Sequence, residues 1–242
     1  MILRIYDDPE TLSSAAAELF AQRAQETIEQ HANFRVVLAG GSTPLATYQK
    51  LARPPLRDQI PWKNIYVFWG DERCVPLDEE RSNYYQTNKT LLSKVPIPVQ
   101  QIYPIRCSHD PEEASRQYLA TLRSFFDESP PRFDLVLLGM GSDAHTASIF
   151  PGFPLDRSKI WVEAAYGGEP ELWRITLTPE IINRAHLVLF LVQGKSKARA
   201  LEQVLHGPNN PLMLPAQRIR PVSGELIWMV DRNAASELKE EK

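Results

Sequence analysis

Five runs of apolar residues in this chain are continuous rather than alternating, and each leads into a glycine or an aspartate. The runs are Phe34–Ala39, Ile65–Trp69, Phe133–Leu138, His186–Val192 and Leu226–Val230. A strand that is buried on both faces has such a continuous run, as in a parallel sheet covered by helices. The pattern therefore predicts a buried parallel sheet.

Between these runs, three helix starts are marked by a capping side chain followed by proline: Asp8-Pro9, Asp110-Pro111 and Thr178-Pro179. The second start is followed by apolar residues at helical spacing, namely Ala114, Tyr118, Leu122 and Phe125. Strands that alternate with helices predict a three-layer α/β/α fold with a mostly parallel, Rossmann-like sheet. No repeat or linker interrupts the pattern, so residues 1–242 are predicted to form a single domain.

The composition narrows the class of partner. Hydrophobic residues make up 43% of the chain and charged residues 24%, which is ordinary for a globular protein, and the net charge is −3. This charge argues against the broad basic surface that nucleic acids and anionic membranes require. Any anion that the protein binds is therefore expected at a local site.

The chain also lacks the patterns of membrane insertion and export. No apolar run approaches the roughly 20 residues of a membrane span, and Met1–Pro9 does not resemble a signal peptide. Cys74 and Cys107 are too few for a disulfide framework and have no zinc-type spacing, so both are expected to be reduced thiols. Together these features predict a cytoplasmic protein.

Four of the predicted strands end in polar, glycine-containing sequences: Gly40–Pro44, Gly70–Arg73, Gly139–Thr146 and Gly194–Lys197. In open parallel sheets, ligands bind beyond the carboxyl ends of the strands. The topology of such a sheet brings all four sequences to one edge. Their convergence predicts a ligand site at that edge.

Three of these sequences suit an anion. Gly40–Thr43 opens a helix, so its glycines, hydroxyls and free N–H groups can surround a phosphate. Gly70–Arg73 adds a guanidinium beside two carboxylates, and Gly194–Lys197 adds two ammonium groups. Each sequence also has a simpler interpretation. Gly40–Thr43 can be a capped turn, Gly70–Arg73 a local ion pair and Gly194–Lys197 a pair of solvated lysines.

Two nucleotide-binding motifs are considered and rejected. The turn at residues 194–197 resembles the end of a Walker A loop, but Leu189 stands where that loop requires glycine. The sequence from Gly139 to Ala144 fits the permissive dinucleotide fingerprint, and Glu163 lies at the distance expected for its acidic residue. The prolines at 151 and 154, however, interrupt the helix that the fingerprint requires.

His145 and Asp143 stand two residues apart in the loop that follows the third run. Histidine has an ordinary pKa near neutrality, so it can take a proton from water, and a neighbouring carboxylate can orient the ring and favour its charged form. The position predicts that His145 is a general base. The remaining histidines have no comparable context and are expected to be ordinary: His31, His109, His186 and His206.

Several catalytic motifs do not occur in the sequence. There is no HExxH, no GxSxG and no carboxylate cluster spaced for a metal. Hydrolysis by a water that a general base activates therefore fits better than a serine nucleophile or a metal hydroxide. Neither a metal nor another cofactor is expected.

At these motifs the chain resembles the 6-phosphogluconolactonases over nearly its whole length. The matching segments, in order, are Leu38–Pro44, Phe68–Pro76, Ser82–Tyr84, Gly139–Pro151, Arg174–Thr178, Gly194 with Lys197, and Pro215-Ala216. The resemblance implies the fold of glucosamine-6-phosphate deaminases. It also implies metal-free hydrolysis of 6-phosphoglucono-1,5-lactone, a small-molecule substrate, to 6-phosphogluconate in the oxidative pentose phosphate route.

The resemblance also assigns roles to residues. His145 corresponds to the family's proposed base, with Asp143 as its neighbour. The positions implied in substrate binding are Gly40, Gly41, Ser42, Thr43, Asp71, Arg73, Arg174 and Lys197. Among them, the phosphate is assigned to Gly41, Ser42, Thr43, Arg73 and Lys197. One departure from the family pattern is Ala144, where glycine is usual; if this position needs a positive φ, alanine costs on the order of 1 kcal/mol.

Two other functions are weighed. A sugar-phosphate deaminase of the same fold carries a glutamate five residues after the histidine, where this chain has Phe150. A non-catalytic sugar-phosphate sensor usually carries a DNA-binding helix-turn-helix, whereas the first ~30 residues here suggest one strand and one helix. Both features favour the lactonase, and the sequence leaves the oligomeric state open.

Overall fold

The computed structural model describes residues 1–107, 110–154 and 160–238. Its main element is a seven-stranded sheet in which every neighbouring pair is parallel. In spatial order the strands are β1 (Ile2–Tyr6), β10 (Glu225–Asp231), β9 (Leu187–Val192), β6 (Leu135–Leu138), β2 (Phe34–Leu38), β3 (Ile65–Trp69) and β5 (Ile102–Tyr103). The five predicted runs are all strands of this sheet, which confirms the predicted fold class.

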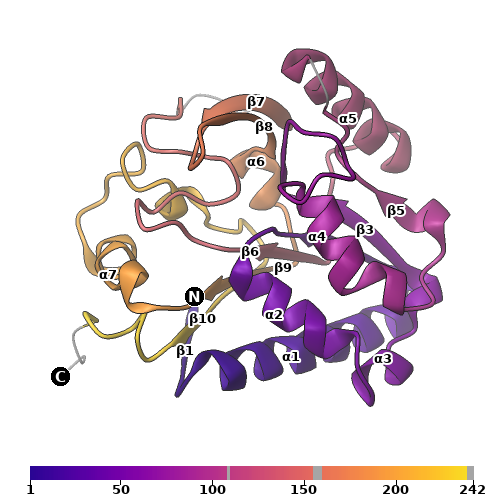
Figure 1. Cartoon of the computed structure of the whole chain (residues 1–242), viewed down its shortest axis with the longest axis horizontal. Helices are drawn as coiled ribbons and strands as arrows, with labels where there is room; N and C mark the ends of the chain where they lie inside the picture. The colour runs from indigo at the N-terminus through magenta and orange to yellow at the C-terminus, as the bar shows by residue number, and fades with distance from the viewer. Residues whose placement is uncertain (108–109, 155–159, 239–242) are drawn as a thin grey trace.

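Helices cover the sheet on both sides. The α-helices are α1 (Pro9–His31), α2 (Ser42–Leu51), α3 (Leu56–Gln59), α4 (Asn83–Thr90), α5 (Pro111–Phe125), α6 (Pro179–Ile182) and α7 (Ala198–His206). Short 3₁₀ turns are η1 (Trp62–Asn64), η2 (Leu92–Lys94), η3 (Val99–Gln101), η4 (Lys195–Lys197) and η5 (Pro215–Arg218). In Figure 1, α1, α2 and α3 lie together below the sheet, while α5 and α7 lie elsewhere around it.

The strand order explains this division. From β1 to β2 and from β2 to β3 the chain moves one way across the sheet, whereas from β5 to β6 and from β9 to β10 it moves the other way. Because crossovers between parallel strands are right-handed, the two directions place their helices on opposite faces. The direction reverses between β6 and β2, and a ligand crevice is expected at such a switch point.

A second, three-stranded antiparallel sheet has the order β4 (Asp71–Arg73), β8 (Leu172–Leu177) and β7 (Val162–Gly167). It is joined to the large sheet at Gly70, whose carbonyl accepts the Leu177 N–H at 2.7 Å. The register places Arg73 opposite Arg174. The sequence does not predict this sheet, because β7 and β8 are not continuous apolar runs and β4 has only three residues.

Two of the three predicted helix caps are confirmed. Asp8 accepts the N–H of Thr11 at 2.7 Å, and Asp110 accepts the N–H groups of Glu112 and Glu113 at the start of α5. The prediction that the Thr178 side chain caps a helix is wrong. α6 does begin after Thr178, but this side chain donates to the carbonyl of Ile160 and leaves the helix uncapped.

The core lies on both faces of the large sheet. On one face, the ring of Phe20 in α1 packs edge-on against Phe34 of β2 at a centroid distance of 5.6 Å. On the other, Phe125 of α5 packs edge-on against Phe68 of β3 at 5.0 Å. Both Phe34 and Phe68 are fully buried. The continuous apolar runs are thus explained by burial of each strand from two sides.

The expectation that both cysteines are reduced thiols is wrong. Cys74 and Cys107 form a disulfide, with their Cα atoms 4.6 Å apart. The residues are separated by 33 positions in the sequence, and only the pairing of β3 with β5 brings the segments that follow these two strands together. Cysteine spacing alone carries no information on such a long-range contact.

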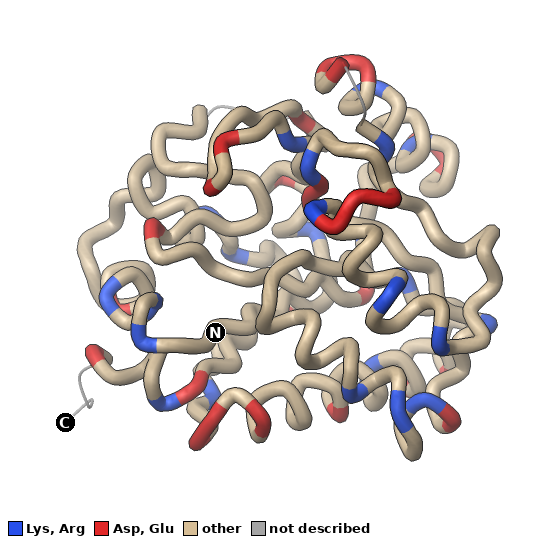
Figure 2. Tube along the Cα trace, viewed as in Figure 1, with Lys and Arg blue, Asp and Glu red and all other residues tan. Residues whose placement is uncertain are grey.

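Charged side chains of both signs are distributed along the whole trace, with a run of acidic residues in the loop before α4 (Figure 2). The run is Asp78, Glu79 and Glu80. Among the described residues, none of the helices has both the length and the apolar character that a bilayer crossing requires.

Candidate active site

A cavity of about 210 Å³ lies at the carboxyl ends of β2, β6 and β9, beside the switch point of the large sheet. Residues of β4, α4 and β8 complete its wall. The residues that line it are Ala39, Gly40, Gly41, Ser42, Thr43, Pro44, Asp71, Arg73, Asn83, Gly139, Met140, Gly141, His145, Ala147, Arg174, Leu191, Val192, Gln193 and Lys197. The four polar sequences at the strand ends therefore meet at one place, as predicted.

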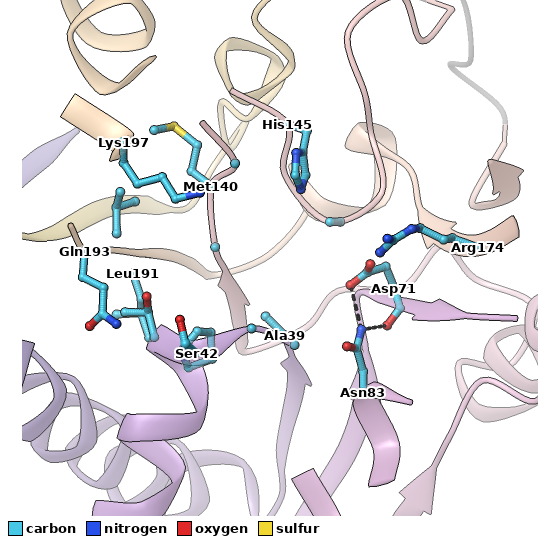
Figure 3. A pocket seen from close by; sticks show the side chains of 18 of the residues that line it. Ala39, Ser42, Asp71, Asn83, Met140, His145, Arg174, Leu191, Gln193 and Lys197 are labelled. Atoms are coloured by element: carbon cyan, nitrogen blue, oxygen red, sulfur yellow. Dashed lines mark hydrogen bonds between the residues drawn. The ribbon is translucent and has the colours of Figure 1, made fainter. Parts of the chain in front are cut away.

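One end of the cavity, which we call the lysine end, carries Ser42, Gln193 and Lys197 (Figure 3). Gly41 has a φ of 98° and is the N-cap of α2, which begins at Ser42. The first N–H groups of a helix have no partner within the helix, and the helix dipole favours negative charge at this end. The lysine end thus has the donors and the charge that a phosphate requires.

The opposite end, which we call the arginine end, carries Asp71, Asn83 and Arg174 (Figure 3). The Asn83 amide donates to the backbone carbonyl of Asp71 at 2.9 Å and to its carboxylate at 3.3 Å. The second carboxylate oxygen of Asp71 accepts the hydroxyl of Ser148 at 2.7 Å. These bonds hold the buried carboxylate in one orientation.

Asn83 also explains one of the glycines in the turn after β2. A Cβ atom at Gly40 would lie 2.0 Å from the Asn83 side-chain oxygen. Only glycine therefore lets α4 approach this turn closely enough for Asn83 to reach Asp71.

The cavity contains basic side chains without acidic partners. Within the ranges that the structure describes, neither Arg73 nor Lys197 forms an ion pair with a carboxylate. Arg73 donates one guanidinium N–H to the carbonyl of Arg81 at 2.6 Å, and its buried Nε has no hydrogen-bond partner among the described residues. The buried Arg174 donates to the carbonyl of Gly167 at 3.0 Å. Burial lowers the pKa of Arg174, an effect that the charge of Asp71 opposes, and an arginine stays charged in such a site.

His145 projects into the cavity between the two ends (Figure 3). Its Nδ1 lies 2.6 Å from Oδ1 of Asp143, and its backbone N–H donates to the same oxygen at 3.1 Å. When Nδ1 carries the proton toward this carboxylate, the lone pair of Nε2 is free. The imidazole is then oriented to accept a proton from a molecule in the cavity.

The backbone around this pair is specialised. A Cβ atom at Gly141 would lie 2.1 Å from Nδ1 of His145 and 2.4 Å from Oδ1 of Asp143, so the pair needs glycine beneath it. Ala144, between the two residues, has a φ of 65°. The sequence-based concern is therefore confirmed: this position uses the left-handed region, where alanine is strained by on the order of 1 kcal/mol.

Two acidic residues behind the cavity wall, Asp143 and Glu72, differ in their pKa values. Burial raises the pKa of Asp143, but the hydrogen bond and charge of His145 outweigh it and lower the pKa to about 2. Burial raises the pKa of Glu72 to about 7, although four hydrogen bonds oppose this shift. Those bonds come from the hydroxyl of Ser82 and the backbone N–H groups of Arg73, Asn83 and Tyr84.

The structure brings the predicted site residues together almost completely. All eight predicted substrate-binding positions and His145 line the cavity, and Asp143 contacts His145 from behind. Glu72, in the middle of β4, is buried and is absent from the lining. His31, His186 and His206 are also absent from it, and His109 lies outside the described residues.

Sequence reasoning missed several contributors. The Ser82–Tyr84 motif contains Asn83 without giving it a role, and no sequence pattern gives a structural role to Ser148, Gln193 or Phe150. Asn83 could have been found from its place in the Ser82–Tyr84 motif, whereas nothing in the sequence pairs Ser148 with Asp71. In the described ranges, no group of three His, Cys, Asp or Glu residues is placed to hold a metal ion.

Comparison with known proteins gives consistent matches. The model of the family "Glucosamine-6-phosphate isomerases/6-phosphogluconolactonase" matches residues 7–228. A 6-phosphogluconolactonase of Synechocystis sp. is 39% identical, over 90% of this chain and 90% of that protein. The solved structure of 6-phosphogluconolactonase from Trypanosoma brucei is 29% identical, with a TM-score of 0.85 and 98% of each chain covered.

The deaminase branch shares the fold. A monomeric glucosamine-6-phosphate deaminase has a TM-score of 0.84 over 98% of this chain and 100% of its own, at 24% identity. This similarity confirms the predicted relationship between the two folds. Because both activities occur on one fold, the choice between them depends on the residues of the site.

Proposed function

The chain belongs to the glucosamine-6-phosphate isomerase/6-phosphogluconolactonase family, and we propose that it hydrolyses 6-phosphoglucono-1,5-lactone to 6-phosphogluconate with His145 as the base. The observation that carries this proposal is the His145–Asp143 pair, which faces a cavity where Arg73 and Lys197 form no ion pair with a carboxylate in the described part of the chain. A general base and a phosphate site in one small cavity suit a substrate that carries both a phosphate and a neutral group that water can attack.

The proposed reaction begins with a water beside Nε2 of His145. As the water oxygen attacks C1 of the lactone, the imidazole accepts one of its protons, and a tetrahedral intermediate with a negatively charged oxygen forms. The bond between C1 and the ring oxygen then breaks, and the imidazolium returns the proton to that oxygen. The products are a carboxyl group at C1 and a hydroxyl at the former ring oxygen, so no atom or electron is left over.

Asp143 supports this cycle as a carboxylate. With a pKa of about 2 it is ionised near neutral pH. It orients the ring through Nδ1 and stabilises the imidazolium that forms when the water is deprotonated. Asp143 itself does not exchange a proton in this scheme.

The phosphate is assigned to the turn of Gly41, Ser42 and Thr43 together with Lys197 and Arg73. The turn supplies hydroxyls and helix N-terminal N–H groups, and Lys197 and Arg73 supply charge without competing carboxylates. Gly40 allows the close approach of Asn83 to this turn. Asp71 and Arg174, at the arginine end, are assigned to the sugar, where their acceptor and donor atoms suit hydroxyl and carbonyl groups.

The deaminase alternative has less support from the site. Phe150 occupies the position of the acid–base glutamate in those enzymes and contributes an apolar ring behind His145. A sensor without catalysis would not need a histidine whose ring is held by a carboxylate at 2.6 Å. Both alternatives predict binding of the sugar phosphate without hydrolysis of the lactone.

The test is a pH-stat or coupled assay of the purified protein on freshly generated 6-phosphogluconolactone, with the spontaneous rate subtracted. Turnover above that rate, retained after exhaustive dialysis against EDTA, is expected. Binding of 6-phosphogluconate without turnover would instead favour the sensor. Loss of activity that Zn²⁺ or Mg²⁺ restores would contradict a reaction without metal. The cytoplasmic location stays a prediction from the sequence.

A further inference from the structure

Phe150 contacts two side chains of the cavity without lining the cavity itself. Its ring centroid lies 5.1 Å from that of His145, with the two planes inclined by 51°. On the other side, Cζ of Arg174 lies 5.6 Å from the centroid of Phe150. A guanidinium at this distance from an aromatic ring is attracted by its π electrons. Phe150 thus bridges the histidine loop and β8.

The hairpin between β7 and β8 holds this arrangement from outside. Gly167 ends β7 and Gly168 begins the turn, with φ values of 153° and 85°. A Cβ atom at Gly167 would lie 2.9 Å from the Phe150 ring, and one at Gly168 would lie 2.4 Å from the guanidinium of Arg174. The two glycines therefore let the hairpin backbone close over both side chains, and the Gly167 carbonyl accepts a hydrogen bond from Arg174.

Arg174 depends on these contacts for its orientation. It is buried, with 6% of its surface exposed, and its long side chain has many rotamers. One hydrogen bond to Gly167 fixes only Nε, whereas the face of the Phe150 ring restricts the guanidinium plane. The same ring closes the space behind His145.

We propose that Phe150 is a positioning residue, which sets the guanidinium of Arg174 and the imidazole of His145 relative to each other. The proposal rests on the proposed function, in which Arg174 and His145 act on the same substrate. Phe150 touches no substrate in this arrangement, since it is absent from the cavity lining. Its effect passes through Arg174, and to a smaller extent through His145.

The chain offers a matched control for the test. Phe153 lies three residues further along, and Cζ of Arg218 lies 5.5 Å from its ring centroid, so the same type of pair occurs there. Neither Phe153 nor Arg218 lines the cavity. Replacement of either phenylalanine by leucine removes an aromatic ring from an arginine, but of the two arginines Arg174 lines the cavity and Arg218 does not.

The experiment compares Phe150→Leu, Phe150→Tyr and Phe153→Leu on 6-phosphogluconolactone. We expect Phe150→Leu to lose roughly 3- to 30-fold in kcat/KM, the range that a cation–π contact supports, while Phe150→Tyr, which keeps the ring, and Phe153→Leu stay within about twofold of the wild type. An equal loss in Phe150→Leu and Phe153→Leu, or no loss in Phe150→Leu, would overturn the proposal.

A double-mutant cycle with Arg174→Lys separates positioning from general packing. If Phe150 acts through the guanidinium, Phe150→Leu should cost at most about twofold in the Arg174→Lys background. Independent, multiplicative losses would show that Phe150 acts by packing alone. The same double-mutant cycle, measured by thermal unfolding, gives the coupling free energy between Phe150 and Arg174 without an activity assay. A wild type that fails to hydrolyse the lactone would therefore contradict the proposed function and still leave this contact testable.

Discussion

The lysine end of the cavity is built from two short stretches of consecutive residues, whereas the arginine end is assembled from four segments that are distant in sequence. At the lysine end, the turns after β2 and β9 supply Ser42, Gln193 and Lys197 directly, and their backbone conformation comes from local glycines. At the arginine end, β4, α4, β8 and the histidine loop must all be in register before Asp71 meets Ser148.

This difference shows how the two ends should respond to change. Residues at the lysine end contact solvent and substrate more than each other, so their substitution should alter binding with little loss of stability. Residues at the arginine end satisfy one another in a buried network, so their substitution should alter stability as well. His145 lies between the two ends, at the point where the reaction is proposed to take place.

The largest effect is expected for His145→Ala. Loss of a general base typically costs roughly 10²–10⁴-fold, so kcat should fall by about that factor while phosphate affinity is nearly retained. The measurement is kcat on the phosphorylated lactone, with the spontaneous rate subtracted, and the binding of 6-phosphogluconate. Retention of most of kcat would mean that another group, of which Asp71 is the nearest candidate in the cavity lining, is the base.

The pH profile of the wild type gives an independent check on the same residue. The rate should decline on the acid side, because a general base acts only while it is unprotonated. Because the pKa of Asp143 is about 2, that carboxylate does not titrate in the same range. The logarithm of the rate should therefore fall with a slope of one, and a slope of two would contradict the assigned roles.

The next effect tests whether Lys197 and Arg73 bind the phosphate of the substrate. A charge-assisted contact contributes roughly 1.5–3 kcal/mol, so Lys197→Ala and Arg73→Ala should each lose roughly tenfold or more in kcat/KM on the phosphorylated lactone. A lactone without phosphate should react poorly and respond little to either change. If Arg73→Ala loses equally on both substrates, Arg73 acts with the arginine end on the sugar.

A smaller effect is expected for Ser148→Ala, which removes the hydroxyl from the buried carboxylate of Asp71. An unsatisfied buried acceptor costs about 1–3 kcal/mol of unfolding free energy. The matched control is Ser196→Ala in the exposed turn at the lysine end, which should stay within about 0.5 kcal/mol of the wild type. Urea unfolding compares the three proteins, and equal stabilities would refute the contrast between the ends.

An effect of pH on stability is expected from Glu72, which is buried beneath the arginine end. Its pKa is raised from 4.5 to about 7, so between these values the folded state holds a proton that the unfolded state has released. Stability therefore falls as the pH rises through this window, by at most ~1.4 kcal/mol per pH unit. The difference in unfolding free energy between the wild type and Glu72→Gln should decrease across the window and then level off. An increase would mean that the four hydrogen bonds outweigh burial.

The large sheet and its helices could be predicted because their signals are local. Buried parallel strands such as Leu187–Val192 are apolar throughout, and α5 begins with an aspartate cap and continues with apolar residues at helical spacing. The strands of the small sheet have no such signal. β4 consists only of Asp71–Arg73. It is a strand because it pairs with β8 in the antiparallel sheet, where Arg73 lies opposite Arg174.

The candidate site divides in the same way. Sequence patterns alone predict that glycine turns with Ser, Thr, Lys and Arg follow buried strands, and that His145 and Asp143 share one loop. Chain topology then implies a common edge. The packing of Asn83 on Gly40, the support that Ser148 and Phe150 give to Asp71 and Arg174, and the Cys74–Cys107 disulfide are known only from the folded chain. The physical reason is range: caps, turns and apolar runs act over a few residues, whereas these contacts arise only when packing places distant segments side by side.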